Sequence, residues 1–146
     1  MIHATPLQAA ASLLVAALLL GGCASPLPYY ESTPTDATVT VIGMGRPAMC
    51  TGGAGYRFNL QWKDQSTSIK VPVGQRVQLS SYIYIQGYNV TSSCNPTLSF
   101  IAAPGKSYIL NAGLANGQCF SELVQEKADS PTGVAPEPTL AGLGCN

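Results

Sequence analysis

The chain has 146 residues and carries seven basic and seven acidic side chains, so its formal net charge at neutral pH is zero. Charged residues make up 10% of it, and the lysines and arginines form no stripe or cluster. Binding to nucleic acid depends on clustered cations that neutralise phosphates, so this composition argues against a nucleic-acid partner. It argues equally against attraction to anionic lipid headgroups.

An apolar run from Ala9 to Leu20 has the length of the core of a secretory signal peptide. A membrane-spanning helix needs about 20 apolar residues, which is more than this run supplies. We therefore expect residues 1–22 to be a signal peptide. The residues before the run include no lysine or arginine, which indicates either a weak signal or a start other than Met1.

The run ends in Leu20-Gly21-Gly22-Cys23, which resembles the lipobox of bacterial lipoproteins. The resemblance implies cleavage before Cys23 and a diacylglyceryl group on its sulfur. Two or three fatty acyl chains such as palmitate would then anchor the protein stably to the membrane. In this class, Ala24 after the cysteine implies the outer membrane, with the protein facing the periplasm or exposed at the surface. The alternative is an ordinary secreted protein in which Cys23 is incidental.

Lipidation of Cys23 leaves four cysteines, Cys50, Cys94, Cys119 and Cys145. Export to an oxidising compartment predicts that they form two disulfides. Three pairings are possible, and we favour Cys50 with Cys94 and Cys119 with Cys145. A zinc site is the alternative, but the chain has no C-x-x-C pair and no histidine after its signal peptide, so we expect no metal and no cofactor.

Composition divides the exported chain into three zones. Residues 23–36 are rich in proline, serine and threonine and indicate an extended tether behind the lipid. Residues 37–127 carry the strand patterns of a folded domain. Residues 128–146 form a Pro/Gly-rich tail, which we expect to be irregular and to be held to the domain by Cys145.

The domain reads as seven strands with short connections and no convincing amphipathic helix. The expected strands are residues 37–43, 56–62, 68–74, 75–87, 97–103, 107–112 and 118–126. Pro104-Gly105 predicts a type II turn, and Asn116-Gly117 predicts a hairpin. This spacing favours an all-β fold, a small disulfide-stapled β-sandwich of about seven strands.

Alternation within the expected strands predicts their buried faces. In residues 56–62, the aromatic and aliphatic side chains of Tyr56, Phe58, Leu60 and Trp62 share one face. In residues 75–87, the apolar face holds Val77, Leu79, Ile83 and Ile85, and the opposite face holds Gln78, Ser80, Tyr82 and Tyr84.

The glycine-rich segment Gly43–Gly55 is expected to be a flexible loop between strands, stapled through Cys50. It lacks the G-x-x-x-x-G-K-[ST] pattern and a following helix, so a phosphate-binding loop is not expected.

Two phrases, IKVPVGQRVQL and APGKSYIL, resemble the PEGA-like and transthyretin-like small β-domains of bacterial envelope proteins. In those domains an apolar strand ends at a Pro/Gly turn, and a later PGK-x-Y turn starts another strand. The resemblance covers about a third of the chain. The families share no catalytic residues, so it implies a fold and not an activity.

The sequence offers little catalytic chemistry. Its one histidine, His3, lies in the expected signal peptide, which excludes histidine-dependent catalysis from the exported chain. Asp64 fits a turn, and Glu122 and Glu126 lie about 13 Å apart along one strand, too far to act together. We interpret these carboxylates as solvated surface groups, expect no catalytic residues, and predict that the protein is not an enzyme.

Tyr82, Tyr84 and Tyr88 are the candidate binding residues, because aromatic side chains on an exposed strand face can stack on sugars or anchor a protein interface. The alternative is that the second sheet, the tail or the tether covers them. The sequence therefore predicts a lipid-anchored, non-enzymatic protein that binds or scaffolds an envelope partner. Two other functions stay open: a module that binds glycan or a small ligand, and an inhibitor of a host hydrolase that acts through the Cys50 loop.

Overall fold

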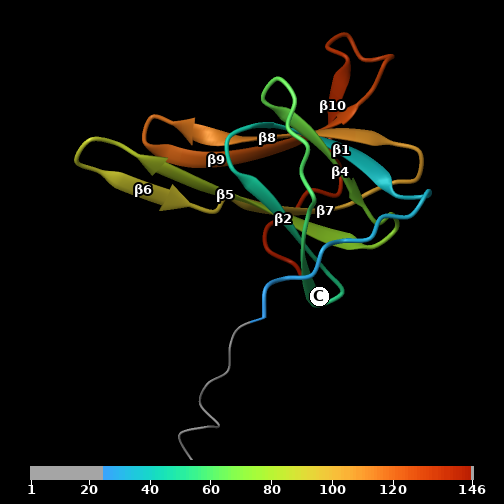
Figure 1. Cartoon of the computed structure of the whole chain (residues 1–146). Coiled ribbons are helices and arrows are strands. Elements are labelled where there is room, and N and C mark those ends of the chain that lie inside the picture. Colours follow the sequence, from blue (N-terminus) through green and yellow to red (C-terminus); the bar gives the residue numbers. More distant parts are fainter. Residues whose placement is uncertain (1–24, 146) are drawn as a thin grey trace, which may run out of the picture.

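The computed structural model describes residues 25–145 and forms an all-β sandwich of two packed sheets (Figure 1). The lipobox residues Leu20–Cys23 and the expected signal peptide lie outside the described residues. Ten strands form in residues 25–145: β1 (Ala37–Gly43), β2 (Arg46–Thr51), β3 (Ala54–Arg57), β4 (Ser66–Val71), β5 (Arg76–Gln86), β6 (Thr91–Cys94), β7 (Thr97–Ile101), β8 (Ser107–Ala115), β9 (Gln118–Glu126) and β10 (Val134–Pro136). Within the same range, no helix is long and apolar enough to cross a membrane.

The first sheet has the strand order β10-β9-β8-β1-β4, in which β1 and β8 are parallel and the other pairs antiparallel. The second sheet runs β3-β2-β5 and continues on the far side of β5 with two short strands. Of these, β7 pairs with β5 from Arg76 to Ser80, and β6 pairs with it from Ile83 to Gln86. Strand β5 is therefore the longest strand and the spine of the second sheet.

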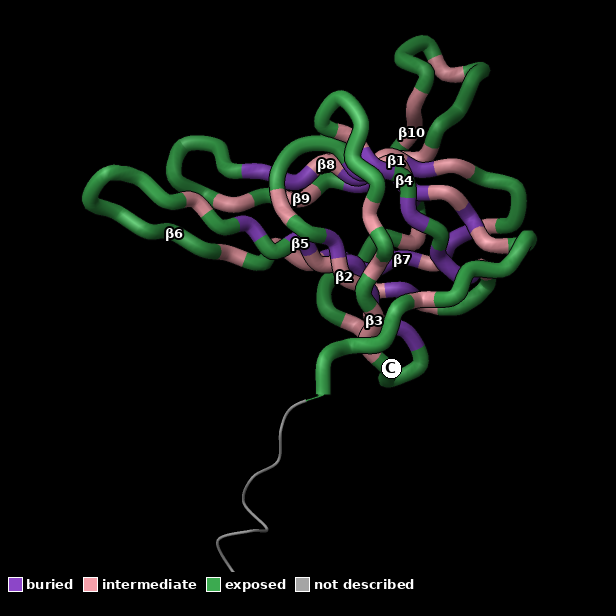
Figure 2. The backbone as a smooth tube through the Cα atoms, in the orientation of Figure 1, coloured by how far each residue is buried: buried purple, intermediate pink, exposed green. Residues whose placement is uncertain are grey.

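Alternating apolar residues of both sheets point inward and form the core, which appears in purple in Figure 2. The largest fully buried side chains include Phe100 and Tyr108, whose rings meet edge to face with centroids 5.1 Å apart. Burial raises the pKa of Tyr108, and its hydroxyl oxygen accepts a hydrogen bond from the Ala103 N–H at 2.8 Å. The buried phenol therefore has a polar partner, as a hydroxyl in a core requires.

The predicted β-sandwich is confirmed, and the first predicted strand has the bounds of β1. Residues 56–62 differ from the prediction, because strand structure ends at Arg57. The rest of this segment crosses from β3 in the second sheet to β4 in the first, so it cannot stay hydrogen-bonded within either. Its Phe58 and Leu60 still pack against the core, whereas Trp62 is 43% exposed.

The glycine-rich segment Gly43–Gly55 was expected to be a loop, and that prediction is wrong, because β2 lies inside it. Pro47 obscures the strand pattern, yet β3 pairs with β2 only from Ala48 onward, so one edge of β2 is open at Pro47. A strand tolerates proline at such a place. The short strands β6 and β10 were not predicted either, since three or four residues give no readable alternation.

Both predicted turns are confirmed. At Pro104-Gly105 the Lys106 N–H donates to the Ala103 carbonyl at 3.3 Å, and Gly105 has a φ of 69°. Glycine fits this turn because the second central residue of a type II turn needs a positive φ. Asn116 and Gly117 both have positive φ angles and join β8 to β9 as a tight hairpin.

All four predicted cysteines form disulfides, but the favoured pairing is wrong. The structure joins Cys50 to Cys145 and Cys94 to Cys119. Cys50 lies on β2 and Cys94 on β6, which are on opposite sides of β5. They are two strand spacings apart across the sheet, about 9.6 Å, and their partners Gln78 and Ile83 are five residues apart along β5. The spacing across the sheet alone already exceeds the reach of a disulfide.

The segment expected as a tether makes contacts with the domain along its second half. The Tyr30 N–H donates to the Arg57 carbonyl of β3, and the Arg57 N–H donates to the Pro28 carbonyl. The Tyr30 ring packs edge to face on Tyr56 and Phe58. The Tyr30 hydroxyl donates to Asp36 Oδ2 at 3.0 Å. Burial and this hydrogen bond raise the pKa of Tyr30 to about 12. Residues 29–36 thus belong to the packed body.

Candidate functional site

Two hairpins extend together from one end of the sandwich, β5–β6 and β8–β9 (Figure 1). The Cys94–Cys119 disulfide joins them, and a hollow of about 650 Å³ between them is lined by residues that include Ile85, Leu114 and Gly117. We call residues 82–95 and 112–121 the arm. The disulfide holds its two hairpins as one unit.

The arm has a surface unlike that of the rest of the domain. Neither of its two segments contains an Asp, Glu, Lys or Arg residue. Several large apolar or aromatic side chains are nevertheless exposed on it: Tyr82, Tyr84, Tyr88, Val90, Leu114 and Phe120. Soluble surfaces normally intersperse charges of both signs, and an exposed apolar area with few charges is typical of an interaction surface.

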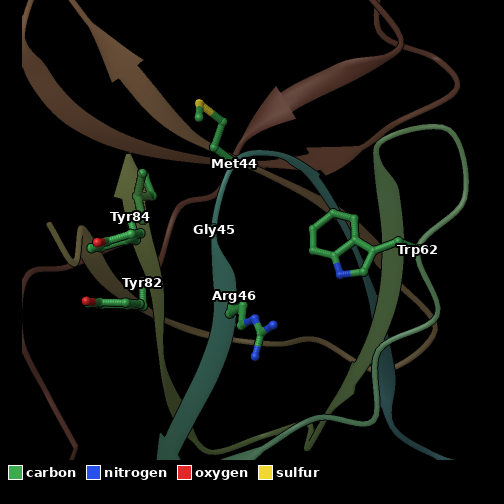
Figure 3. Close-up of a pocket in the computed structure, with 7 residues that line it drawn as sticks. Met44, Gly45, Arg46, Trp62, Tyr82 and Tyr84 are labelled. Atoms are coloured by element: carbon green, nitrogen blue, oxygen red, sulfur yellow. The ribbon is translucent and has the colours of Figure 1, made fainter. Parts of the chain in front are cut away.

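The candidate binding residues lie on this arm, and the structure brings two of the three together. Tyr82 and Tyr84 are 52% and 55% exposed and project from the same face of β5 (Figure 3). Tyr88 stands apart near the tip of the β5–β6 hairpin, fully exposed. None of the three is buried by the second sheet, the tail or the tether within residues 25–145.

The path of the C-terminal tail explains why the outer face of β5 is exposed from Tyr82 onward. Its residues cross the outer face of the second sheet and exchange backbone hydrogen bonds between Ala141 and Ser99 of β7. The Gly144 N–H then donates to the side chain of Gln78 at 3.0 Å. Next, Cys145 is fixed to Cys50, which pairs with Gln78. The described part of the tail thus covers β5 at Gln78 but not at Tyr82 or Tyr84.

A hollow of about 480 Å³ lies beside the two tyrosines, where β2 begins (Figure 3). Arg46 stands directly opposite Tyr82 in the β2–β5 pair, and Trp62 lies across β2 from the tyrosines. A second hollow of about 520 Å³ shares Arg46, Trp62 and Tyr82 with the first and extends to Arg57. The two hollows form one groove with aromatic walls and two arginines.

Both arginines are available to an anion. The Arg57 guanidinium lies over the Tyr29 ring, 4.0 Å from its centroid, which orients it by cation–π attraction. Within residues 25–145, the one ion pair joins Lys127 to Asp129, and no carboxylate lines either hollow. Sequence reasoning missed Arg46, Arg57 and Trp62 as site residues, because they come together only through strand pairing and the crossing segment.

The carboxylates named in the sequence analysis lie outside the groove in the part of the chain that the structure describes. Asp64 has a positive φ in the turn before β4, and Glu122 and Glu126 are exposed on β9, away from the groove. Glu137, in the tail, is buried and accepts hydrogen bonds from the backbone and hydroxyl of Thr139. Over residues 25–145, no group of three metal-ligating side chains forms.

Asp36 is the carboxylate with a shifted pKa. Its partial burial would raise the pKa, but hydrogen bonds from the Thr33 hydroxyl and N–H and from Tyr30, together with the charge of Lys70, hold it below the ordinary value. These contacts fix the chain immediately before β1. Asp36 is therefore a structural group of the body and lies outside the groove.

Comparisons with protein-family models, with curated proteins and with solved structures find no match to this chain. The site consists of an arm without charged side chains, a row of two exposed tyrosines, and a groove lined by two arginines.

Proposed function

We propose that the protein is a lipid-anchored, non-enzymatic component of the cell envelope that binds or scaffolds another envelope component. The binding surface is the arm together with the adjoining groove, with Tyr82 and Tyr84 at its centre. Cys23 supplies the anchor, and two disulfides suit a domain that works in an oxidising compartment such as the periplasm.

The observation that carries this proposal is the exposure of large apolar side chains on a charge-free arm. The core is formed by other side chains, and the three tyrosines of the arm are exposed and do not belong to it. Tyrosine, tryptophan and arginine are the residues most enriched at the energetic centres of protein interfaces, and Tyr82, Trp62 and Arg46 meet here. A surface of this composition favours a role in binding a partner over a role in catalysis.

The binding surface is tested by site-specific photo-crosslinking in cells, with the photo-reactive residue at position 84. We expect a discrete adduct with an envelope component. The matched control places the same residue at Ser68, which is exposed on β4 in the other sheet. Equal adducts from both positions, or none from position 84 with the protein folded and anchored, would contradict the proposed surface.

The anchor is tested separately by Cys23→Ala. We expect the variant to leave the membrane fraction and to appear in the soluble fraction, because the acyl chains are lost. If the variant stays entirely with the membrane, the lipid anchor is wrong, whatever the crosslinking shows.

A glycan ligand is a second candidate, favoured by the planar surfaces of Trp62 and Tyr82 along an open groove. In that case the full chain should bind isolated peptidoglycan, and Tyr82→Ala should weaken the binding. The hydrolase-inhibitor alternative loses its main support, since Cys50 lies in a strand of the sheet and not in a protruding loop.

A further inference from the structure

One edge of β5 is open along the arm. Strand β2 begins at Arg46, which pairs with Tyr82, and the chain before it comes from the first sheet, where the Met44 N–H donates to Ala112. On its other side, β5 remains paired with β6 out to Gln86. Among residues 25–145, no strand takes the place of β2 beside residues 83–86.

The register shows which backbone groups face this open edge. The N–H groups of Ser81 and Gly87 both donate to carbonyls on the β6 side of the strand, at 3.1 and 2.7 Å. Successive residues of a strand direct their N–H and C=O groups to opposite sides. The backbone groups of Tyr84 and Gln86 therefore point to the edge that β2 leaves open.

A hollow lies at the start of this edge. It has a volume of about 480 Å³ and is lined by residues Met44 to Arg46, by Trp62 and by residues Tyr82 to Tyr84 of β5. In Figure 3 the chain runs from Met44 through Gly45 into β2 alongside Tyr84 and Tyr82. Gly45 packs closely on Ile83 and on the Tyr82 carbonyl, so the free part of the edge is residues 84–86. These residues offer about 10 Å of strand, enough for three residues of an added strand.

The charges at the edge indicate the chemistry of the occupant. Arg46 stands where the open edge begins, and Arg57 lies further along the same groove. Each guanidinium has five N–H donors suited to a carboxylate. No acidic side chain within residues 25–145 lines the groove, so the two arginines are complementary to an acidic occupant.

We propose that an extended, acidic segment of a partner protein adds to the open edge of β5 as an extra strand in line with β2. Its backbone pairs with Tyr84 and Gln86, and a carboxylate at its end binds Arg46. Strand addition at an exposed edge takes its affinity from main-chain hydrogen bonds and its specificity from alternate side chains. This inference rests on the proposed function and specifies the partner.

The test is a selection with a randomised twelve-residue peptide library against the full chain. Enriched peptides are then synthesised, and their affinities for variants of the full chain are measured by calorimetry. We expect enriched sequences to be acidic and rich in strand-forming residues. On peptide binding, the amide hydrogens of Tyr84 and Gln86 should become protected from exchange.

Proline variants isolate the backbone contribution. Gln86→Pro removes an N–H from the open edge and should weaken peptide binding about tenfold. Ser93→Pro is the matched control, since by the same register its N–H faces the outer edge of β6, and it should leave the affinity within about twofold. Arg46→Glu should weaken binding by about tenfold or more, whereas Lys106→Glu, at a distant exposed turn, should not.

Several outcomes would overturn strand addition. They are a library that yields no enriched sequence, enriched peptides that bind the Gln86→Pro variant as well as the original chain, and concentration-dependent pairing of two copies through this edge. Binding of isolated peptidoglycan that Gln86→Pro leaves unchanged also counts against it.

Crosslinking from position 84 separates the inference from the function on which it rests. If Gln86→Pro leaves the cellular adduct intact, the arm is the binding surface but strand addition is wrong. If position 84 gives no adduct in the otherwise unchanged chain, the proposed function fails as well.

Discussion

The outer face of β5 has two halves with opposite surroundings. From Arg76 to Ser80 the face is crossed by the C-terminal tail, which hydrogen-bonds to Arg76, Ser99 and Gln78. From Tyr82 to Gln86 the same face is bare and aromatic. The alternation of side chains is continuous through both halves, so the difference comes from what packs on the strand and not from the strand itself.

Each half is tied by its own disulfide. Cys50–Cys145 fixes the tail over the covered half, and Cys94–Cys119 joins the two hairpins of the arm. Charged side chains follow the same division. The arm has none, and all charged residues within 25–145 lie in the rest of the domain, which we call the body. The body thus holds the core and the tail, and the arm holds exposed apolar side chains.

Removal of each disulfide gives the largest expected effects. Loss of Cys50–Cys145, which spans 95 residues, should lower the free energy of unfolding by about 4.7 kcal/mol in the chain-entropy treatment. Loss of Cys94–Cys119, which spans 25 residues, should cost about 3.5 kcal/mol. Urea unfolding of the Cys→Ala pairs measures both.

Amide exchange then locates the two effects. Without Cys50–Cys145, protection should fall at Ser99 and Ala141, where the tail pairs with β7. Without Cys94–Cys119, it should fall in β6 and not in the tail. Loss of protection spread equally over both halves in either variant would contradict the division.

Side-chain truncation gives the next contrast. Phe100 is fully buried, so Phe100→Ala should lower the free energy of unfolding by about 3–5 kcal/mol through lost packing and a cavity. Tyr84→Ala removes a side chain that is 55% exposed and should change it by no more than about 0.5 kcal/mol. Thermal and urea unfolding provide the comparison. A large loss in Tyr84→Ala would mean that the arm depends on Tyr84 for its structure.

Acidification is expected to have the smallest effect on the free energy of unfolding, and it acts on the body and not on the arm. The pKa of Asp36 is lower in the folded protein than its ordinary value of 3.8, so folding favours its ionised form. The resulting stabilisation is complete above the unfolded pKa and is lost as the pH falls through the folded value. Urea unfolding between about pH 5 and pH 2 should show this slope, and Asp36→Asn should reduce it.

The arm provides the internal control for the acid experiment. It contains no carboxylate, so its amide exchange, corrected for the intrinsic effect of pH, should not change before the body loosens. An arm that opens first would show that acid acts elsewhere than at Asp36.

Sequence patterns were sufficient where a strand keeps a long, regular alternation or a turn needs a particular residue. The fold class, β1, the buried face of β5 and the turns at Gly105 and Asn116-Gly117 follow from such local rules. Sequence patterns were insufficient for β2, where Pro47 and the flanking glycines hide the strand. They were also insufficient for residues 58–62, whose sequence alternates although these residues form no strand.

For the site, the sequence by itself determined that Tyr82 and Tyr84 share the polar face of their strand, because side chains alternate along any β-strand. Only the tertiary structure decided that this face stays uncovered, that Arg46 and Trp62 lie beside it, and which cysteines pair. These are contacts between residues far apart in the chain. They depend on strand order, on where β2 begins and on where the tail stops, which no local pattern encodes.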